Sequence, residues 1–88
     1  MKVWFITGAS RGFGALMTKE ALASGDAVIA TARNPKTVTE QFGDHPNLLA
    51  VALDVTNEAQ AKEAAAAGIA RFGRIDVLAN NAGYGLLG

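Results

Sequence analysis

The sequence predicts an α/β fold in which a parallel sheet is covered by helices on both faces. Three observations lead to this prediction. Short apolar runs alternate along the chain with longer segments of helical character. The first run, residues 2–7, is continuously apolar in its interior, as expected for a strand buried on both faces. The first run leads directly into a glycine-rich turn, which is typical of a strand–turn–helix unit.

Four strands are expected, and turn-forming residues follow each of them. The four expected strands are residues 2–7, 27–31, 48–53 and 75–79. Strands that alternate with helices imply right-handed crossovers and a parallel sheet. In a doubly wound, Rossmann-type sheet the strand order becomes 3-2-1-4, with the ligand site in the crevice between the first and fourth strands. The prediction is therefore a three-layer Rossmann-type fold, truncated after its fourth strand.

The first two helices have recognisable ends. The first covers residues 12–24 and stops at Gly25, where a left-handed residue is favoured. The apolar residues that recur in it at helical spacing are Phe13, Leu16, Met17 and Ala21. The second helix begins at Asn34 and Pro35, which suit the cap and the first helical position, and ends near residue 42.

The third helix is expected over residues 57–72, with Thr56 as its cap. It is rich in alanine, which favours helix but buries little surface. Ile69 and Phe72 are therefore expected to supply most of its packing against the sheet.

The glycine-rich turn after the first strand is suited to hold a nucleotide pyrophosphate. Gly8 lets the chain turn sharply, and Gly12 removes a side chain that would keep a phosphate from the backbone. Gly14 lets the first helical turn lie close to the sheet. The spacing Gly-x-x-x-Gly-x-Gly is longer than the commoner Gly-x-Gly-x-x-Gly. A glycine motif alone is weak evidence, so the rest of the chain has to support it.

Two further motifs follow in order along the chain. Residues 53–56 read Leu-Asp-Val-Thr after the third strand, and residues 80–83 read Asn-Asn-Ala-Gly after the fourth. Together with residues 7–14, these motifs resemble the short-chain dehydrogenase/reductase family. The resemblance covers nearly the whole chain but corresponds to only the N-terminal part of such an enzyme. Residues 1–88 are therefore expected to be an incomplete dinucleotide-binding domain.

The resemblance implies which residues bind the cofactor. Ser10 and Arg11 would help to hold the adenosine phosphates. Asp54 would accept a hydrogen bond from the adenine amine, and the Val55 N–H would reach a ring nitrogen; Asp54 could also favour the next helix through its charge. Residues 81–83 would lie along the ribose while one asparagine joins the central strands, or the segment is a simple strand-ending turn. The expected cofactor-binding residues are Gly8, Ser10, Arg11, Gly12, Phe13, Gly14, Arg33, Asp54, Val55, Asn81, Ala82 and Gly83.

Arg33 indicates which cofactor is preferred. In dinucleotide folds an acid about 20 residues after the glycine motif binds the ribose 2′-hydroxyl of NAD. Here that place holds Arg33, and the nearest acid, Asp26, precedes the second strand at the wrong end. A guanidinium binds a 2′-phosphate through charge-assisted hydrogen bonds, and Arg11 could be a second clamp. NADP(H) is therefore expected over NAD(H), unless Arg33 is only a solvated loop charge.

Catalytic residues are not expected in this chain. Hydride-transferring members of the family use a Tyr four residues before a Lys, with a Ser upstream. The single tyrosine here, Tyr84, is followed four positions later by Gly88, and neither Ser10 nor Ser24 is placed for the role. The chain alone is expected to lack dehydrogenase activity. Its parent would be an NADP(H)-dependent oxidoreductase, a homo-oligomer, with a carbonyl or alcohol as its small-molecule substrate.

The composition of the chain limits which other classes of protein it could belong to. Eight basic residues balance eight acidic ones, so no basic excess favours nucleic acid. There are no cysteines for thiolate metal sites, and no metal is expected. No apolar run approaches the ~20 residues that span a bilayer, and a cytoplasmic protein is expected. A stand-alone, noncatalytic nucleotide-binding module stays open, whereas a methyltransferase-like Rossmann domain is disfavoured by the glycine spacing and residues 80–83.

Overall fold

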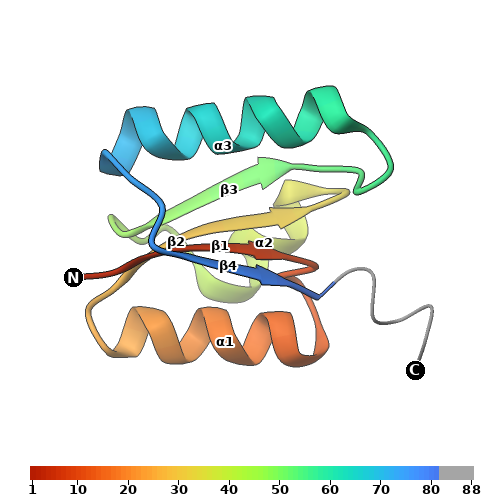
Figure 1. Ribbon diagram of the computed structural model, residues 1–88. Helices are drawn as coiled ribbons and strands as arrows, with labels where there is room; N and C mark the ends of the chain where they lie inside the picture. Colours follow the sequence, from red (N-terminus) through yellow and green to blue (C-terminus); the bar gives the residue numbers. More distant parts are fainter. Residues whose placement is uncertain (82–88) are drawn as a thin grey trace.

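A four-stranded parallel sheet organises residues 1–81, the part of the chain that the computed structural model describes (Figure 1). The strands stand in the order β3-β2-β1-β4. They are β1 (Val3–Thr7), β2 (Ala27–Ala32), β3 (Leu48–Ala52) and β4 (Val77–Asn80). The helices are α1 (Gly12–Ala23), α2 (Pro35–Phe42) and α3 (Glu58–Phe72). The predicted fold class and strand order are confirmed, and the predicted bounds are right to within two residues.

The sheet is buried on both faces because helices cover each of them. α1 and α2 pack on one face and α3 on the other (Figure 1). Successive residues of a strand point to opposite faces, so Phe5 and Ile29, which are register partners, face α3. Ile6 and Val28 belong to the core beneath α1 and α2. This arrangement explains why the strands read as continuous apolar runs.

The buried face of α1 differs from the expectation. Phe13 and Leu16 are 76% and 52% exposed, so they do not anchor the helix. The residues buried in α1 are Gly14, Thr18 and Ala21. These are small side chains, because α1 approaches the glycine-rich turn and the sheet too closely for larger ones. Ala21 is buried and Met17 packs against the core, so the apolar spacing was right for these two residues and wrong for Phe13 and Leu16.

The start and the packing of α3 also correct the sequence prediction. Its cap is Asn57, whose side chain accepts from the N–H of Gln60 at 3.1 Å, and not Thr56. Ile69 is 48% exposed and contributes little, although Phe72 does pack against the core. Ala64 and Gly68 are the buried residues of the helix. α3 therefore lies close to the sheet through the small residues Ala64 and Gly68, with Phe72 packing at its end.

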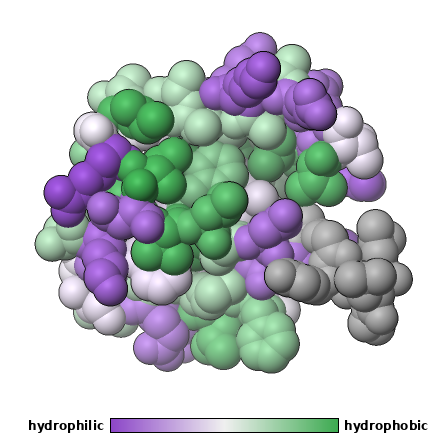
Figure 2. All heavy atoms as spheres, in the orientation of Figure 1, coloured by the Kyte–Doolittle hydropathy of each residue, from purple (hydrophilic) through white to green (hydrophobic). Residues whose placement is uncertain are grey.

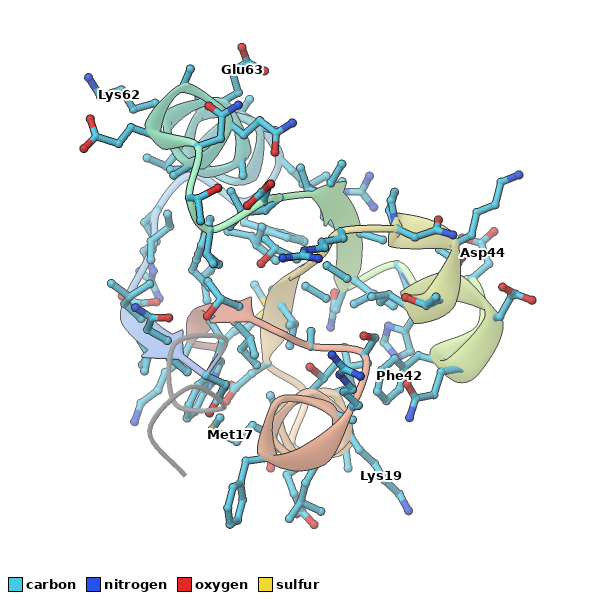
Figure 3. All side chains as sticks on the ribbon, turned by 90° about the vertical axis from the view of Figure 1, so that its right-hand side faces the viewer. Met17, Lys19, Phe42, Asp44, Lys62 and Glu63 are labelled. Carbon is cyan, nitrogen blue, oxygen red and sulfur yellow. The ribbon has the colours of Figure 1, made fainter. Side chains whose placement is uncertain are left out.

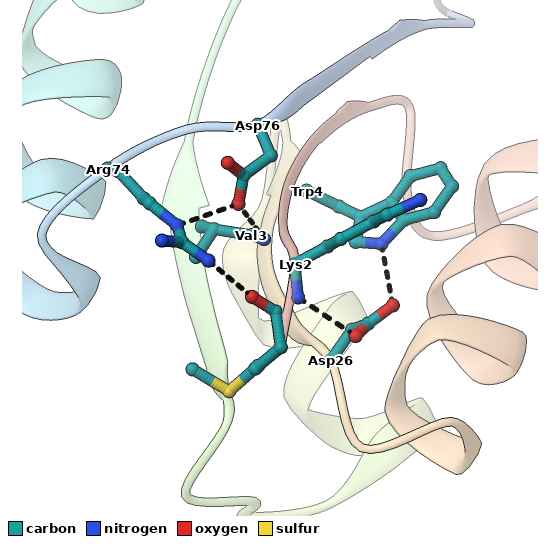
Figure 4. A network of polar contacts seen from close by, with 7 residues as sticks. Lys2, Val3, Trp4, Asp26, Arg74 and Asp76 are labelled. Carbon is teal, nitrogen blue, oxygen red and sulfur yellow. Dashed lines mark hydrogen bonds and ion pairs between the residues drawn. The ribbon is translucent and has the colours of Figure 1, made fainter.

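Two carboxylates hold the beginning of β1 (Figure 4). Asp26 accepts from the backbone N–H of Lys2 at 3.0 Å and from the indole Nε1 of Trp4 at 3.1 Å. Asp76 accepts from the N–H of Val3 at 2.8 Å and from Arg74 Nε at 2.9 Å. These contacts tie β1 to the segments that lead into β2 and β4. They lie at the amino-terminal edge of the sheet, which confirms that Asp26 is remote from the opposite edge.

Candidate functional site

The predicted site residues that the structure describes gather at the carboxyl ends of the strands. Figure 3 looks onto this edge, which is the side to which the arrows of Figure 1 point. The last residue of β1, Thr7, is the register partner of Asn80 at the end of β4. Open α/β sheets bind ligands at this edge, beside the point where the winding direction reverses. The crevice between β1 and β4 is that point here.

The glycine-rich turn leaves β1 through backbone conformations that suit glycine. Gly8 and Gly12 have φ values of 61° and 60°, in the left-handed region that side chains disfavour. A hydrogen bond of 3.0 Å from the Ala9 N–H to the Thr31 carbonyl ties the turn to β2. Among residues 1–81, a Cβ placed on Gly12 would meet nothing within 4 Å. The space above Gly12 is thus open to a ligand.

Gly14 permits a contact that no other residue allows. A Cβ on Gly14 would lie 2.0 Å from the carbonyl oxygen of Gly8. The absence of a side chain therefore lets the first turn of α1 close against the turn that follows β1, whereas the sequence prediction named the sheet as the neighbour. The N-cap, Arg11, makes no side-chain capping bond, and the first turn of α1 has no acidic residue. The N–H groups at this end of α1 consequently favour an anion.

Two arginines add positive charge to this edge. Arg11 and Arg33 are exposed, and neither guanidinium has a hydrogen bond or ion pair to another residue within 1–81. Arg33 follows β2 directly, and its charge acts on Asp54, which follows β3. The pKa of Asp54 is lowered mainly by the Thr56 hydroxyl, further by the Thr56 N–H, and also by the charge of Arg33. Asp54 is therefore an anionic acceptor at neutral pH.

The segment after β3 is a tight turn into α3. Asp54 Oδ1 accepts from the Thr56 N–H at 3.0 Å and from its hydroxyl at 2.7 Å. The Asp54 carbonyl accepts from the N–H of Asn57 at 2.9 Å. The Asp54 N–H donates to Gln60 Oε1 at 2.7 Å. Val55 is exposed, and within the described part of the chain its N–H makes no hydrogen bond.

The asparagine pair at the end of β4 divides its roles. Asn80 Oδ1 accepts from the Thr7 hydroxyl at 2.9 Å, and the backbone N–H of Asn81 donates to the same hydroxyl at 2.9 Å. The side chain of Asn80 thus links β1 to β4. The side-chain nitrogen of Asn81 is buried and makes no hydrogen bond in the part of the chain described. Ala82 and Gly83 lie outside the described residues, as does Tyr84.

Sequence reasoning gave no role to two residues that support the site. Thr7 joins the strand ends, but a threonine at a strand end gives no signal of its own. Gln60 holds the Asp54 N–H, and the pattern Asn57-x-x-Gln60 is the signature of a helix capping box. That signature could have identified both the cap and Gln60.

Within residues 1–81, no cluster of three acidic or histidine side chains could hold a metal ion, and no helix is both long and apolar enough to cross a membrane.

Comparison with known proteins finds oxidoreductases that are similar to this chain. The family model of short chain dehydrogenases matches residues 2–87. Oxidoreductase BOA17 of Botryotinia fuckeliana is 51% identical over 86 residues, covering 94% of this chain and 31% of that protein. NADP-dependent 3-hydroxy acid dehydrogenase YdfG of Escherichia coli K12 is 40% identical over 84 residues, covering 92% of this chain and 33% of that protein.

The fold has counterparts among solved structures. A short-chain dehydrogenase from Streptomyces avermitilis superposes with a TM-score of 0.81 at 43% identity. The match covers 89% of this chain and 30% of that one. The chain therefore spans about a third of the length of the relatives it matches.

Proposed function

Because the chain belongs to the short-chain dehydrogenase family, we propose that it binds the adenosine and phosphate part of NADP(H). In this proposal it is the N-terminal, nucleotide-binding portion of a longer oxidoreductase. The bound nicotinamide would supply or accept a hydride, with a carbonyl or alcohol as the second substrate. The residues of this chain would bind and orient the other end of the cofactor.

One observation carries the proposal: the glycine-rich turn and the N-terminus of α1 meet at the switch point of the sheet in an arrangement that suits an anion. Gly12 leaves space above the backbone, and Gly14 brings α1 close to the end of β1. The N-terminus of α1 is neither capped by a side chain nor opposed by an acid in its first turn. These features fit a pyrophosphate, which needs backbone N–H donors and close approach. Ser10 and Phe13 belong to the same segment, where they would border the phosphates.

The preference for NADP(H) rests on Arg33. It follows β2, where an acid would bind the 2′-hydroxyl of NAD, and its guanidinium makes no hydrogen bond or ion pair within residues 1–81. Arg11, from the glycine-rich turn, would be the second cation. The printed name of the relative YdfG includes NADP dependence, which agrees with this assignment. The proposal for this chain depends on the charge of Arg33.

The adenine and ribose would lie between the ends of β3 and β4. Asp54 offers a carboxylate oxygen and Val55 an N–H, which together match the edge of an adenine. The buried side-chain nitrogen of Asn81 has no acceptor within residues 1–81, and a ribose or phosphate oxygen would satisfy it. Ala82 and Gly83 would continue the ribose contact.

Calorimetric titration of the purified chain tests the proposal. We expect NADPH to bind more tightly than NADH, and adenosine 2′,5′-bisphosphate more tightly than 5′-AMP, at one fixed ionic strength. Gly14→Ala should abolish binding of all four, because the added Cβ would collide with the Gly8 carbonyl. A folded wild-type chain that binds none of these ligands would overturn the proposal. Equal affinities for the members of each pair would refute its NADP(H) part.

A further inference from the structure

The turn between β3 and α3 uses most of the polar atoms of Asp54. Its N–H, its carbonyl and its Oδ1 each have partners among Gln60, Asn57 and Thr56. Oδ2 makes no hydrogen bond within residues 1–81, and neither does the N–H of Val55. One acceptor and one donor therefore remain on adjacent residues.

This pair is complementary to adenine and not to a base with a carbonyl at the same position. Adenine presents a donor on its exocyclic amine and an acceptor on the adjacent ring nitrogen. Hypoxanthine presents an acceptor and a donor at the same two places. A buried or constrained polar group that meets the wrong partner loses a hydrogen bond and leaves a group unsatisfied. The orientation of Asp54 and Val55 therefore determines whether the site can distinguish these bases.

Gln60 fixes that orientation from α3. Its Oε1 accepts the Asp54 N–H at 2.7 Å, while its own N–H donates to Asn57 Oδ1 at 3.1 Å. Gln60 is half-buried and belongs to the first turn of a helix. On the preceding residue, the Leu53 N–H donates to the Ala32 carbonyl at 2.9 Å. β2 thus holds the peptide that joins Ala52 to Leu53, and Gln60 holds the next one, which joins Leu53 to Asp54.

We propose that Gln60 is a positioning residue that gives this site its selectivity for adenine. It does not contact the base; it holds the Asp54 backbone so that Oδ2 and the Val55 N–H face one ligand edge together. Without this acceptor the Asp54 N–H would have to find water, and the peptide would be free to rotate. The inference rests on the proposed nucleotide-binding function and assigns a residue that determines specificity within it.

The test compares NADPH with its hypoxanthine analogue on the whole chain. Gln60→Ala should weaken NADPH binding roughly 3- to 10-fold, the equivalent of one net hydrogen bond, and change binding of the analogue by less than about twofold. Gln60→Glu keeps an acceptor and should retain most of the preference for adenine. Glu63→Ala is the matched control, since Glu63 lies on α3 and points away from the sheet (Figure 3). It should leave both affinities unchanged.

Proportional weakening of both ligands in Gln60→Ala would overturn the inference, because it would mean that Gln60 only stabilises the turn. A Gln60→Ala variant that prefers NADPH over the hypoxanthine analogue as strongly as the wild type does would overturn the inference equally. Should circular dichroism show that Gln60→Ala is unfolded, Gln60→Met, which keeps the length of the side chain, is judged by the same two criteria. A folded wild-type chain that binds neither ligand would refute the proposed function itself.

Discussion

Arg33 and Asp54 follow neighbouring strands and carry opposite charges, yet they differ in how far their side chains are already hydrogen-bonded within the fold. Asp54 Oδ1 is committed to Thr56, whose hydroxyl and N–H are the main causes of its lowered pKa. Arg33 is only the last contributor to that shift and has no ion pair within residues 1–81. The guanidinium is therefore available to an incoming phosphate, while the carboxylate stays ionised without it.

Arg33→Asp should reverse the cofactor preference. A hydrogen bond to a charged group contributes about 1.5–3 kcal/mol, so NADPH binding should weaken at least 10- to 150-fold. NADH binding should be unchanged or improved, because an aspartate can accept from the 2′-hydroxyl. Titration of both cofactors at one ionic strength checks this, since salt screens an exposed contact.

Lys19→Asp is the control for Arg33→Asp, since it makes the same change of charge on a side chain that points away from the sheet (Figure 3). It should shift both affinities slightly and leave their ratio unchanged. If Arg33→Asp lowers both affinities in proportion, Arg33 is a solvated loop charge and the preference for NADP(H) has to be abandoned.

Among the elements, α3 shows how small residues can set a packing distance. A Cβ on Gly68 would lie 2.1 Å from Cδ1 and 2.6 Å from Cγ1 of Ile29. Ile29 is completely buried, so its side chain cannot move without disturbing the sheet. Gly68 therefore allows α3 to lie close against β2, although glycine inside a helix costs about 1 kcal/mol of stability relative to alanine.

Gly68→Ala should destabilise the fold in spite of its better helix propensity. Inserting a methyl group into a tightly packed site costs typically 1–3 kcal/mol, which should outweigh the gain in propensity. Urea unfolding should show the loss, and Gly68→Ala combined with Ile29→Val, which removes the nearest colliding atom, should recover part of it. A stabilised single variant, or additive losses in the double variant, would show that α3 is not seated on Ile29.

The helices and strands could be predicted from the sequence more accurately than the contacts that their side chains make. The strands, the glycine-rich turn and the strand order followed from apolar runs, glycine positions and the rules of βαβ connection. The cap of α3 did not, because Thr56 and Asn57 are both capping residues and only the structure shows Thr56 bound to Asp54. The exposed Phe13 was expected at the core because periodicity ignores how closely Gly14 draws α1 inward. The separate roles of the two asparagines depend on β1, more than 70 residues earlier (Figure 1).

In the whole molecule, the two edges of the sheet serve different purposes. The carboxyl edge holds the candidate site, where Asp54 Oδ2 and the guanidinium of Arg33 make no hydrogen bond within residues 1–81. At the amino-terminal edge, Asp26 and Asp76 accept hydrogen bonds from the backbone N–H groups of Lys2 and Val3 and so hold β1 from both sides (Figure 4). The Lys2 N–H and then the Trp4 indole lower the pKa of Asp26. The Val3 N–H and then Arg74 lower the pKa of Asp76.

These shifts predict the acid sensitivity of the fold. A carboxylate whose pKa is lower in the folded state stabilises the fold fully above its unfolded pKa of ~3.9, and this stabilisation is lost as pH falls through the folded pKa. The urea midpoint should therefore be nearly constant between about pH 5 and 7 and fall steeply below about pH 4. Asp26→Asn and Asp76→Asn should be less stable at pH 7 and flatter in acid.

Asp44→Asn is the control for the two carboxylates, since Asp44 is exposed and makes no hydrogen bond or ion pair within residues 1–81. It should leave the pH profile unchanged. Identical acid profiles for wild type and the Asp26 and Asp76 variants would show that the carboxylates do not tie β1 in solution.

The side of the molecule on which β4 lies exposes apolar surface. Apolar side chains gather around β4, between α1 and α3 (Figure 2). β4 stands at the end of the strand order and pairs with β1 alone among the described strands. Leu78 is 68% exposed there and borders an apolar hollow with Phe5, Ala61, Ala65 and Ile75. An unpaired strand edge with apolar neighbours is a template for association.

The 88-residue chain should therefore associate through β4 when it is studied alone. Sedimentation velocity should show a weight-average mass that rises with concentration. Leu78→Lys should lower that association several-fold, because a charged side chain on an edge strand opposes pairing. Ile69→Lys is the matched control: it places the same charge on an apolar side chain that is also exposed, at 48%, but lies on α3 and not on a strand edge. A wild-type chain that stays monomeric at all concentrations, or two variants with equal effects, would show that the β4 edge does not drive association.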